Sequence, residues 1–290
     1  MSLGFTRLTR ALALLSLVML TALPAGAEQP LPIFDAHLHY SQGAWAEFPP
    51  SVVARKLKDA GVPWALASSS PDEGTLALVE HDARRFVPEL RPYRGRVNSG
   101  NWPDDAATPD FLAARLKRGA GKDGSIRYRG IGEFHLLRTE DARTPVLKAV
   151  ARMAVARDVL LHVHAGAEPV RVLFALEPRL RILWAHAGMV TPPEEVRRMM
   201  ERHANLWAEV SFRAEDILPG KLLDPTWKSL LLAYPERFMI GSDTYTNSRW
   251  EVYGSLIASH RAWLGLLPPK AARAIAHGNA LRVLGVKAGK

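Results

Sequence analysis

The feature that most constrains the fold of this chain is an alternation of short β-rich runs with amphipathic stretches, without a long proline-rich or low-complexity interruption. Strands that alternate with helices at this spacing form parallel βαβ units. Eight such units in about 250 residues match the size of a (β/α)8 barrel. A doubly wound open sheet usually carries a glycine-rich phosphate turn after its first strand, whereas FDAHLH (34–39) stands there. We therefore predict an α/β fold, a single-domain (β/α)8 TIM barrel.

The predicted elements follow from this alternation. Several predicted helices begin at a proline, which suits a first helical turn because its missing N–H would be unpaired there. The eight predicted strands are Ile33–His39, Trp64–Ser68, Val87–Tyr93, Tyr128–Leu136, Val159–His164, Ile182–His186, Leu206–Phe212 and Phe238–Asp243. The predicted helices are Pro49–Ala60, Glu73–Arg85, Pro109–Arg118, Pro145–Arg157, Glu168–Leu176, Pro193–His203 and Pro225–Tyr234, followed by a helical tail from Asn247.

The first 27 residues are expected to be a signal peptide. Arg7 and Arg10 precede an apolar run over 11–23, and the small-residue segment 25–27 follows. This run is shorter than the ~20 residues that a membrane-spanning helix needs. We expect cleavage after Ala27, a mature domain over 28–290, a periplasmic or secreted location and no membrane span after cleavage. An uncleaved anchor is the alternative.

Composition narrows the chemistry. The chain contains no cysteine, which excludes a disulfide framework, a thiolate nucleophile and metal sites built on sulfur ligands. The formal net charge is +9 and becomes +7 without Arg7 and Arg10, but the basic residues are scattered. We expect a small-molecule substrate and no nucleic-acid partner, whereas strong salt-dependent DNA binding would favour a nuclease. The oligomeric state is left open.

Ionisable residues gather where the predicted strands end. In a (β/α)8 barrel these carboxyl ends surround the active site. Side chains two residues apart on a strand share a face, so the pairs on the first, fourth and fifth strands each point to one side. Burying this many imidazoles and carboxylates is costly unless something compensates them, and a divalent cation does so. The residues at these ends are His37, His39, Glu133, His135, His162, His164, His186 and Asp243.

The segments FDAHLHY, GIGEFH, LLHVHAG, WAHAGM and GSDTY, in this order, together with the closing IAHGNALRVLG, resemble the amidohydrolase superfamily, in particular its amidohydrolase-related and TatD-like branches. The resemblance implies a metal-dependent hydrolase in which His37 and His39 bind the metal. It implies that Asp243 is a further ligand or the general base. His186 is expected to be a ligand or a catalytic polarising group.

Two ligand positions are less constrained by the resemblance. Many members carry a carboxylated lysine on the fourth strand, where this chain has Glu133, which is expected to bridge two metals or to orient a ligand. On the fifth strand His162 is preferred as the ligand and His164 as a substrate contact. One or two ions are expected, with zinc preferred and manganese, iron or cobalt as alternatives.

The remaining expectations concern the substrate. Arg94 and Arg213 lie where a carboxylate or phosphate could be clamped, and Asp35 is expected to accept a hydrogen bond from a ligand imidazole. The expected reaction is attack of a metal-activated water on an amide, a lactone, another ester or a phosphoester. The alternatives are a metal-dependent decarboxylase of the same superfamily and a periplasmic metal-binding barrel without turnover.

Overall fold

The computed structural model describes Met1 and residues 30–287. The expected signal peptide and its cleavage point after Ala27 lie outside the described residues. Within the described part of the chain, no helix is both long enough and apolar enough to cross a membrane.

Residues 31–287 fold around eight parallel strands whose order in space is their order in the chain, as expected for a (β/α)8 barrel. The ring is closed by a parallel bridge between Asp35 and Ile240, with the Ala36 N–H donating to the Ile240 carbonyl at 2.7 Å. The strands are β1 (Phe34–His39), β2 (Trp64–Ser68), β3 (Phe86–Leu90), β4 (Gly130–His135), β5 (Leu160–His164), β6 (Ile182–Trp184), β7 (Leu206–Glu209) and β8 (Phe238–Met239).

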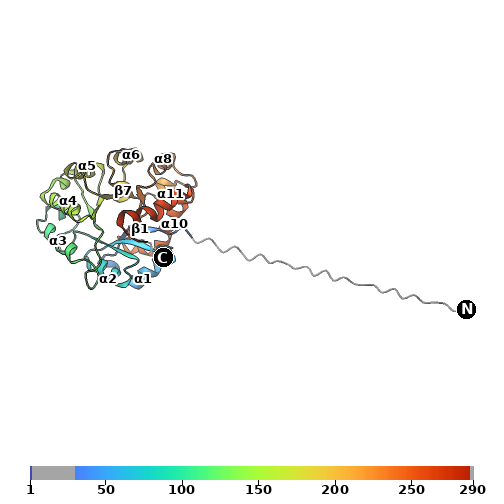
Figure 1. Cartoon of the computed structure of the whole chain (residues 1–290), viewed down its shortest axis with the longest axis horizontal. Coiled ribbons are helices and arrows are strands. Elements are labelled where there is room, and N and C mark those ends of the chain that lie inside the picture. The colour runs from blue at the N-terminus through green and yellow to red at the C-terminus, as the bar shows by residue number, and fades with distance from the viewer. Residues whose placement is uncertain (2–29, 288–290) are drawn as a thin grey trace. The chain divides into compact units, whose positions relative to one another are not determined.

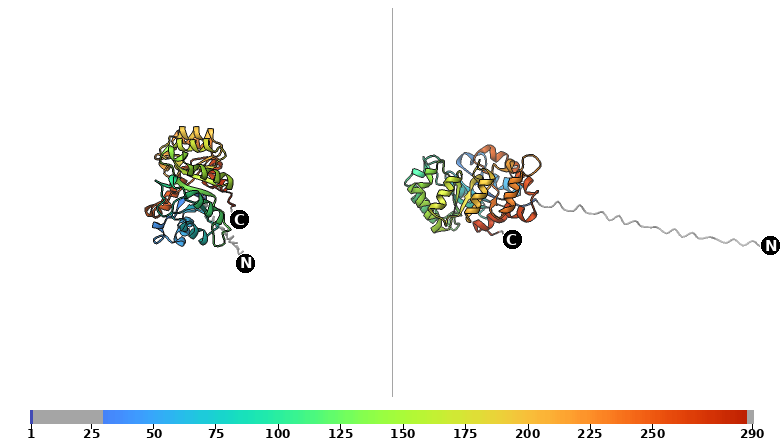
Figure 2. Two further views of the ribbon diagram at one scale, coloured as in Figure 1. Left: turned by 90° about the vertical axis from the view of Figure 1, so that its left-hand side faces the viewer. Right: turned by 90° about the horizontal axis from the view of Figure 1, so that it is seen from above.

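Helices surround the strands, as the views along and across the barrel show (Figures 1 and 2). Proline begins several of them, and side-chain caps fix two: Thr144 accepts from the Leu147 N–H ahead of α4, and Asp224 accepts from two N–H groups of α8. The α-helices are α1 (Pro50–Asp59), α2 (Glu73–His81), α3 (Thr108–Arg118), α4 (Pro145–Arg157), α5 (Ala167–Leu176), α6 (Pro193–Arg202), α7 (Ala214–Ile217), α8 (Pro225–Ala233), α9 (Asn247–Glu251), α10 (Tyr253–Leu264), α11 (Pro269–Arg273) and α12 (Asn279–Leu284).

Several predicted elements end earlier than expected. The helix predicted to reach Arg85 ends at His81, because Asp82 leaves helical geometry and its side chain accepts from the Arg84 and Arg85 N–H groups. The sixth strand ends at Trp184 because His186 adopts a left-handed conformation in η4 (Ala185–Ala187). The eighth strand spans only two residues, so Asp243 follows it in a loop rather than ending it.

The interior of the barrel is apolar at the bottom and polar at the top. Its lower layer comprises Phe34, Ala36, Leu66, Val87, Leu160, Leu183, Trp207 and Met239. Helix α12 covers this layer with Ala280, Val283 and Leu284, whose exposed fractions are 5% or less. A bulge in β1 between Asp35 and Leu38 changes which residues face inward above this layer. The ionisable residues therefore lie directly above this apolar lower layer.

Candidate metal centre and active site

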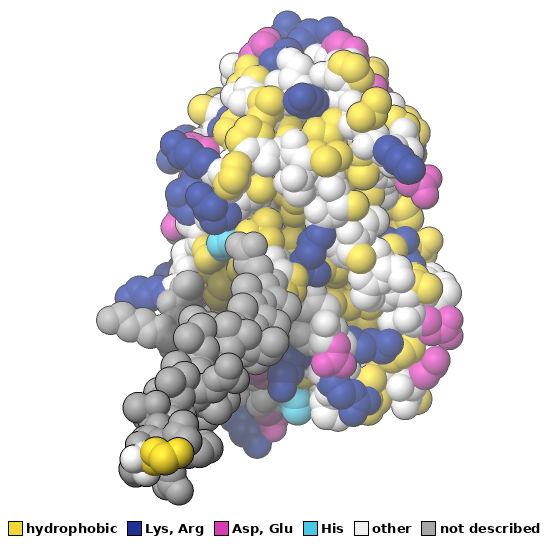
Figure 3. Space-filling view, turned by 90° about the vertical axis from the view of Figure 1, so that its right-hand side faces the viewer, with side chains coloured by type: hydrophobic (Ala, Val, Ile, Leu, Met, Phe, Trp, Pro, Cys, Tyr) yellow, Lys and Arg dark blue, Asp and Glu magenta, His cyan; other side chains and the backbone are white. Residues whose placement is uncertain are grey.

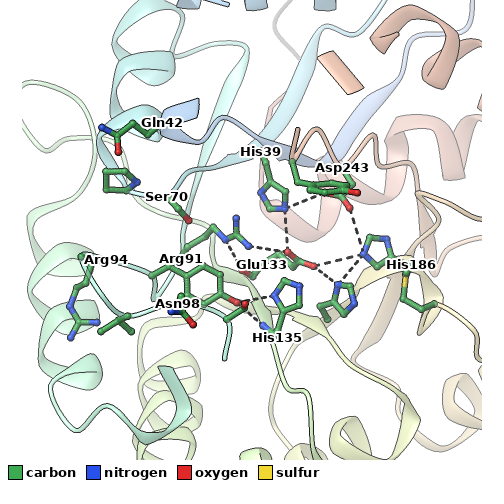
Figure 4. Close-up of a pocket in the computed structure, with 18 of the residues that line it drawn as sticks. His39, Gln42, Ser70, Arg91, Arg94, Asn98, Glu133, His135, His186 and Asp243 are labelled. Atoms are coloured by element: carbon green, nitrogen blue, oxygen red, sulfur yellow. Dashed lines mark hydrogen bonds and ion pairs between the residues drawn. The ribbon is translucent and has the colours of Figure 1, made fainter. Parts of the chain in front are cut away.

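A pocket of about 920 Å³ opens above the polar layer, at the carboxyl ends of the strands. Its floor includes His39, Glu133 and Asp243, which lie together in Figure 4. Its walls come from loops that follow several strands. This position matches that of active sites in (β/α)8 barrels.

Four side-chain atoms from three segments converge on one point of the floor, and we call them the first donor cluster: His37 Nε2, His39 Nε2, Glu133 Oε2 and Asp243 Oδ1. The two imidazole nitrogens are 2.9 Å apart. Glu133 Oε2 lies 3.2 Å from His39 Nε2 and 3.8 Å from His37 Nε2. Asp243 Oδ1 lies 3.3 and 3.5 Å from the same two atoms.

The opposite oxygens of the same two carboxylates face a second donor cluster, formed with His164 Nδ1 and His186 Nε2. Glu133 Oε1 lies 2.8 Å from His164 Nδ1 and 3.8 Å from His186 Nε2. The two imidazole nitrogens are 3.2 Å apart, and Asp243 Oδ2 lies 3.8 Å from His186 Nε2. Glu133 and Asp243 therefore each present one oxygen to each cluster (Figure 4).

The separations in both clusters suit ligands of a common ion. Two ligands about 2.1 Å from a tetrahedral ion lie about 3.4 Å apart, and the separations found here run from 2.8 to 3.8 Å. The second nitrogen of each histidine in the first cluster is already engaged, His37 Nδ1 with Glu209 at 2.9 Å and His39 Nδ1 with Ser68 at 2.9 Å. If both histidines donate from Nδ1, two Nε2 lone pairs face each other, which requires a cation between them.

The carboxylates at the floor of the pocket stabilise positive charge beside them. Burial lowers the pKa of His37, but the neighbouring carboxylates of Asp243, Glu209 and Glu133 outweigh burial and hold this pKa well above its usual value. Burial raises the pKa of Glu133, but the His37 charge and hydrogen bonds from histidines reverse this and hold it well below the usual range. Burial, together with the Arg91 charge, lowers the pKa of His39 to about 3.

Arg91 forms part of the pocket wall beside Glu133 (Figure 4). Its Nε donates to the Glu133 carbonyl at 2.9 Å, and its Nη2 donates to Glu133 Oε2 at 3.3 Å. The guanidinium also lies 4.5 Å from the centre of the Tyr93 ring. Arg91 therefore fixes both the backbone and the carboxylate of the residue that the two clusters share.

Tyr93 and His135 form a second support beside the second donor cluster. The Tyr93 hydroxyl accepts from the His135 backbone N–H at 2.9 Å and lies 2.9 Å from His135 Nδ1. Burial raises the pKa of Tyr93 to about 12, so the hydroxyl keeps its proton. The His135 ring stacks on that of His164 at 4.3 Å. His135 thus positions His164, a member of the second donor cluster.

The structure brings together His37, His39, Glu133, His186 and Asp243, and it places His164 beside them, whereas His162, the histidine preferred as a ligand, groups with His37 and Glu209. His164 lies in the second donor cluster. His162 lies one layer deeper, where its Nδ1 is 3.1 Å from Glu89 and its Nε2 is buried without a hydrogen-bond partner. The alternation along β5 places both on the inner face, and only the height of β5 relative to β4 decides between them.

The expected substrate contacts divide. Arg94 lines the pocket, but its guanidinium binds Asp105 at 2.7 Å and the Thr108 hydroxyl at 3.1 Å. Arg213 does not line the pocket and is not the expected clamp: it is buried, pairs with Asp216 at 2.7 Å and packs over the Trp227 ring. Local partners thus engage Arg94, whereas Arg213 pairs with Asp216 but keeps Nε and Nη1 buried without a hydrogen bond.

Asp35 also differs from expectation. The bulge in β1 turns its side chain to the outer face, where it accepts from the Ser242 hydroxyl at 2.6 Å and the Tyr253 hydroxyl at 3.0 Å instead of from an imidazole. Burial raises the pKa of Asp35 to about 6 against these hydrogen bonds. Its contact with the His37 N–H at 3.2 Å supports the strand and not a ligand tautomer.

Sequence reasoning missed two residues of the site, Glu209 and Arg91. Glu209 stands in the apolar strand LWAE and is fully buried. A lone charged residue in a strand buried on both faces requires a partner inside the barrel, and that rule could have identified both Glu209 and its counterpart Glu89. Arg91 follows β3 directly, at a strand end where (β/α)8 barrels place functional side chains.

Non-glycine residues with left-handed backbone conformations cluster around the pocket. Of the six such residues in the described part of the chain, four line the pocket: His186 (φ 55°), Met189 (φ 55°), Phe212 (φ 61°) and Asp243 (φ 48°). Such conformations are uncommon for residues with a Cβ. They turn the chain sharply after β6, β7 and β8, and so direct His186 and Asp243 toward Glu133.

The fold and site together define a barrel enzyme of the kind that carries a histidine and carboxylate metal centre at the carboxyl ends of its strands. The family model for amidohydrolases matches residues 34–286, and the chain belongs to this family. Membership of this family identifies the protein as a hydrolase-type enzyme. No curated protein sequence was found to match the chain.

Solved structures share the fold at low sequence identity. A zinc-bound amidohydrolase from Burkholderia multivorans aligns over 88% of this chain and 100% of its own, with a TM-score of 0.60 and 15% identity. A candidate 2-pyrone-4,6-dicarboxylic acid hydrolase from Pseudomonas putida aligns over 89% and 99%, with a TM-score of 0.59 and 18% identity. A TatD-like protein from Archaeoglobus fulgidus aligns over 87% and 100%, with a TM-score of 0.52 and 18% identity.

Proposed function

We propose that this protein is a hydrolase that uses a divalent metal centre to direct water at the carbonyl carbon of an ester, lactone or amide. The observation that carries the proposal is the position of Glu133, whose two oxygens face two donor clusters at the floor of a deep pocket. Zinc is the proposed metal because imidazole and carboxylate ligands suit it, and because one structural neighbour was solved with zinc bound.

Each cluster is proposed to hold one ion. The first would be held by His37, His39, Glu133 and Asp243, and the second by Glu133, His164 and His186, with Asp243 at their boundary. A divalent ion there lowers the pKa of water toward neutrality and polarises a carbonyl oxygen. Two ions next to shared carboxylates would also balance the negative charge of the floor.

Asp243 is proposed as the general base. Its side chain is 9% exposed toward the pocket, compared with 3% for Glu133, so it is the carboxylate that substrate can approach. It would take a proton as the water oxygen bonds to the carbonyl carbon. When the bond to the leaving oxygen or nitrogen breaks, Asp243 would return that proton to the leaving group. Arg91 would keep Glu133 in place during these steps.

The pocket wall indicates the kind of substrate. Gln42, Ser70 and Asn98 supply polar groups on one side, and Met189 and Phe212, both partly exposed, supply apolar surface on the other. Lactone hydrolysis is the first reaction to test, because a 2-pyrone-4,6-dicarboxylic acid hydrolase is the assignment given to one structural neighbour.

The test combines metal content with turnover. Mass spectrometry should find one to two equivalents of metal in the purified protein and a large loss in the His37→Ala/His39→Ala variant. A panel of lactones, aryl esters and anilides should then reveal an activity that chelation abolishes, metal restores and Asp243→Asn removes. A folded protein without metal after reconstitution would refute the metal-dependent reaction.

Export belongs to the same proposal. The charged and apolar pattern of residues 7–27 supports a cleaved leader, and the mature hydrolase would then act in the periplasm or outside the cell. N-terminal sequencing of the protein from a periplasmic fraction should begin at Glu28. A cytoplasmic protein with an intact N-terminus would contradict this.

A further inference from the structure

Glu209 lies beneath both donor clusters without belonging to either. It is fully buried, and its Oε1 lies 2.9 Å from His37 Nδ1. We propose that Glu209 is a positioning residue that fixes the tautomer of His37 and the placement of His186, and thereby sets the metal affinity of the two clusters. This inference rests on the proposed metal-dependent function.

The contacts of Glu209 reach both clusters. Its Oε1 also accepts from the His186 N–H at 2.6 Å, and its Oε2 accepts from the Ser211 N–H at 2.7 Å. The Ser211 hydroxyl in turn lies 2.7 Å from His186 Nδ1. One carboxylate therefore holds His37 directly, and holds His186 both through its backbone and through Ser211.

The backbone leaves space for this carboxylate at Gly241. A Cβ at this position would lie 2.1 Å from Glu209 Oε2 and 2.8 Å from the His37 Cβ. Both separations are far below van der Waals contact, so glycine is required here as long as Glu209 and His37 keep their places. The segment GSD thus contributes two residues to the site: Gly241 leaves room for Glu209, and Asp243 belongs to the donor clusters.

The charge of Glu209 has a direct effect on the ligand. A carboxylate that accepts the Nδ1 proton of a ligand histidine fixes its Nε2 as the lone-pair nitrogen and increases its basicity. Loss of such a partner typically weakens metal binding by about 10- to 100-fold. Because His37 belongs to the first donor cluster, we expect this loss of metal affinity in that cluster.

The chain provides a matched control on β3, four strands away from β7 in the ring. Glu89 is also buried on the inner face and pairs with a histidine, its Oε2 lying 3.1 Å from His162 Nδ1. His162 lies outside both donor clusters. Glu89→Gln therefore removes a buried carboxylate that pairs with a histidine, without removing the partner of a proposed ligand.

Zinc affinity of the metal-free wild type, Glu209→Gln and Glu89→Gln should be measured by competition with a chromophoric chelator, with near-UV circular dichroism to verify folding. We expect zinc to bind about 10- to 100-fold more weakly to Glu209→Gln and with unchanged affinity to Glu89→Gln. Equal affinity of Glu209→Gln and wild type, or equal weakening by both substitutions, overturns the inference alone. Failure of the wild type to bind zinc overturns the proposed function as well.

A measurement on the wild type decides the question if Glu209→Gln does not fold. In zinc-loaded protein labelled with ¹⁵N-histidine, the His37 signals, identified by their loss in His37→Gln, should show a proton on Nδ1 and zinc on Nε2. A His37 protonated on Nε2 would overturn the inference, because Glu209 would then not receive the Nδ1 proton.

Discussion

His260 gives the barrel a stability that should fall in acid. It is buried on α10, where its Nε2 lies 3.1 Å from the Gly241 carbonyl and its Nδ1 accepts from the Trp263 indole N–H at 3.2 Å. Because an indole nitrogen only donates, the neutral ring must carry its proton on Nε2. Burial lowers the pKa of His260 to about 4.

The direction of the effect follows from proton binding. In the unfolded chain His260 takes up a proton near its ordinary pKa of 6.5, whereas in the folded protein it does so only near pH 4. The unfolded state therefore binds more protons than the folded state between these pH values. The stability that neutral His260 gives the folded protein is present above pH 6.5 and is lost as the pH falls toward 4. These two values give a loss of about 2 kcal/mol between pH 8 and pH 5 from His260 alone.

The assay is urea denaturation of metal-free wild type and His260→Gln at pH 8 and pH 5, followed by tryptophan fluorescence and far-UV circular dichroism in parallel. Glutamine does not titrate but can donate to Gly241 and accept from Trp263. The free energy of unfolding should fall by about 2 kcal/mol more in the wild type than in the variant, a difference of about 1 M in midpoint. An equal fall in both proteins would refute the reasoning.

Three further predictions concern the site and its floor. Glu133→Gln removes the carboxylate shared by both donor clusters and should lower the metal content, measured by mass spectrometry. It should also reduce turnover, measured by steady-state kinetics, by a larger factor than the loss of about 10- to 100-fold that is typical of residues that only orient ligands. His164→Asn should lose about one metal equivalent, whereas His162→Asn should retain the wild-type content. Leu284→Ala should destabilise the barrel by about 2–5 kcal/mol, measured by urea denaturation, because it leaves a cavity between α12 and the lower layer.

Each of these has a contrary result. Full metal content in Glu133→Gln would show that neither cluster depends on the carboxylate. Loss of metal in His162→Asn instead of His164→Asn would restore the order of the fifth-strand histidines that the sequence analysis preferred. A destabilisation of Leu284→Ala below 1 kcal/mol would mean that α12 does not hold the floor of the barrel.

The sequence was sufficient for the barrel because each strand and helix carries its own local signal. Alternation along β1, β4 and β5 also predicted correctly which pairs of histidine and carboxylate residues share the inner face. The choice between His162 and His164 depends on how far β5 is shifted along β4, and that shift includes a bulge between Ile131 and Phe134. A non-local register of this kind leaves no signal in either strand alone.

The ion-pair partners of the charged residues near the site could not be predicted from the sequence either. Arg213 stands at a strand end, but Asp216, three residues later, pairs with it in the loop that follows β7. Basic residues were expected to be scattered, and on the face in Figure 3 lysine and arginine side chains are indeed dispersed among acidic and hydrophobic ones.

The left-handed backbone positions around the pocket also bear on engineering of this enzyme. Phe212 and Met189 are exposed at the mouth of the pocket and are natural targets for substitution, yet a β-branched residue at either position would strain the left-handed backbone there. Gln42 and Asn98 line the opposite wall, and neither has a left-handed backbone conformation or a cis peptide bond. A library intended to alter substrate range should therefore vary that wall freely, and should restrict the mouth to asparagine, aspartate, glycine and unbranched side chains.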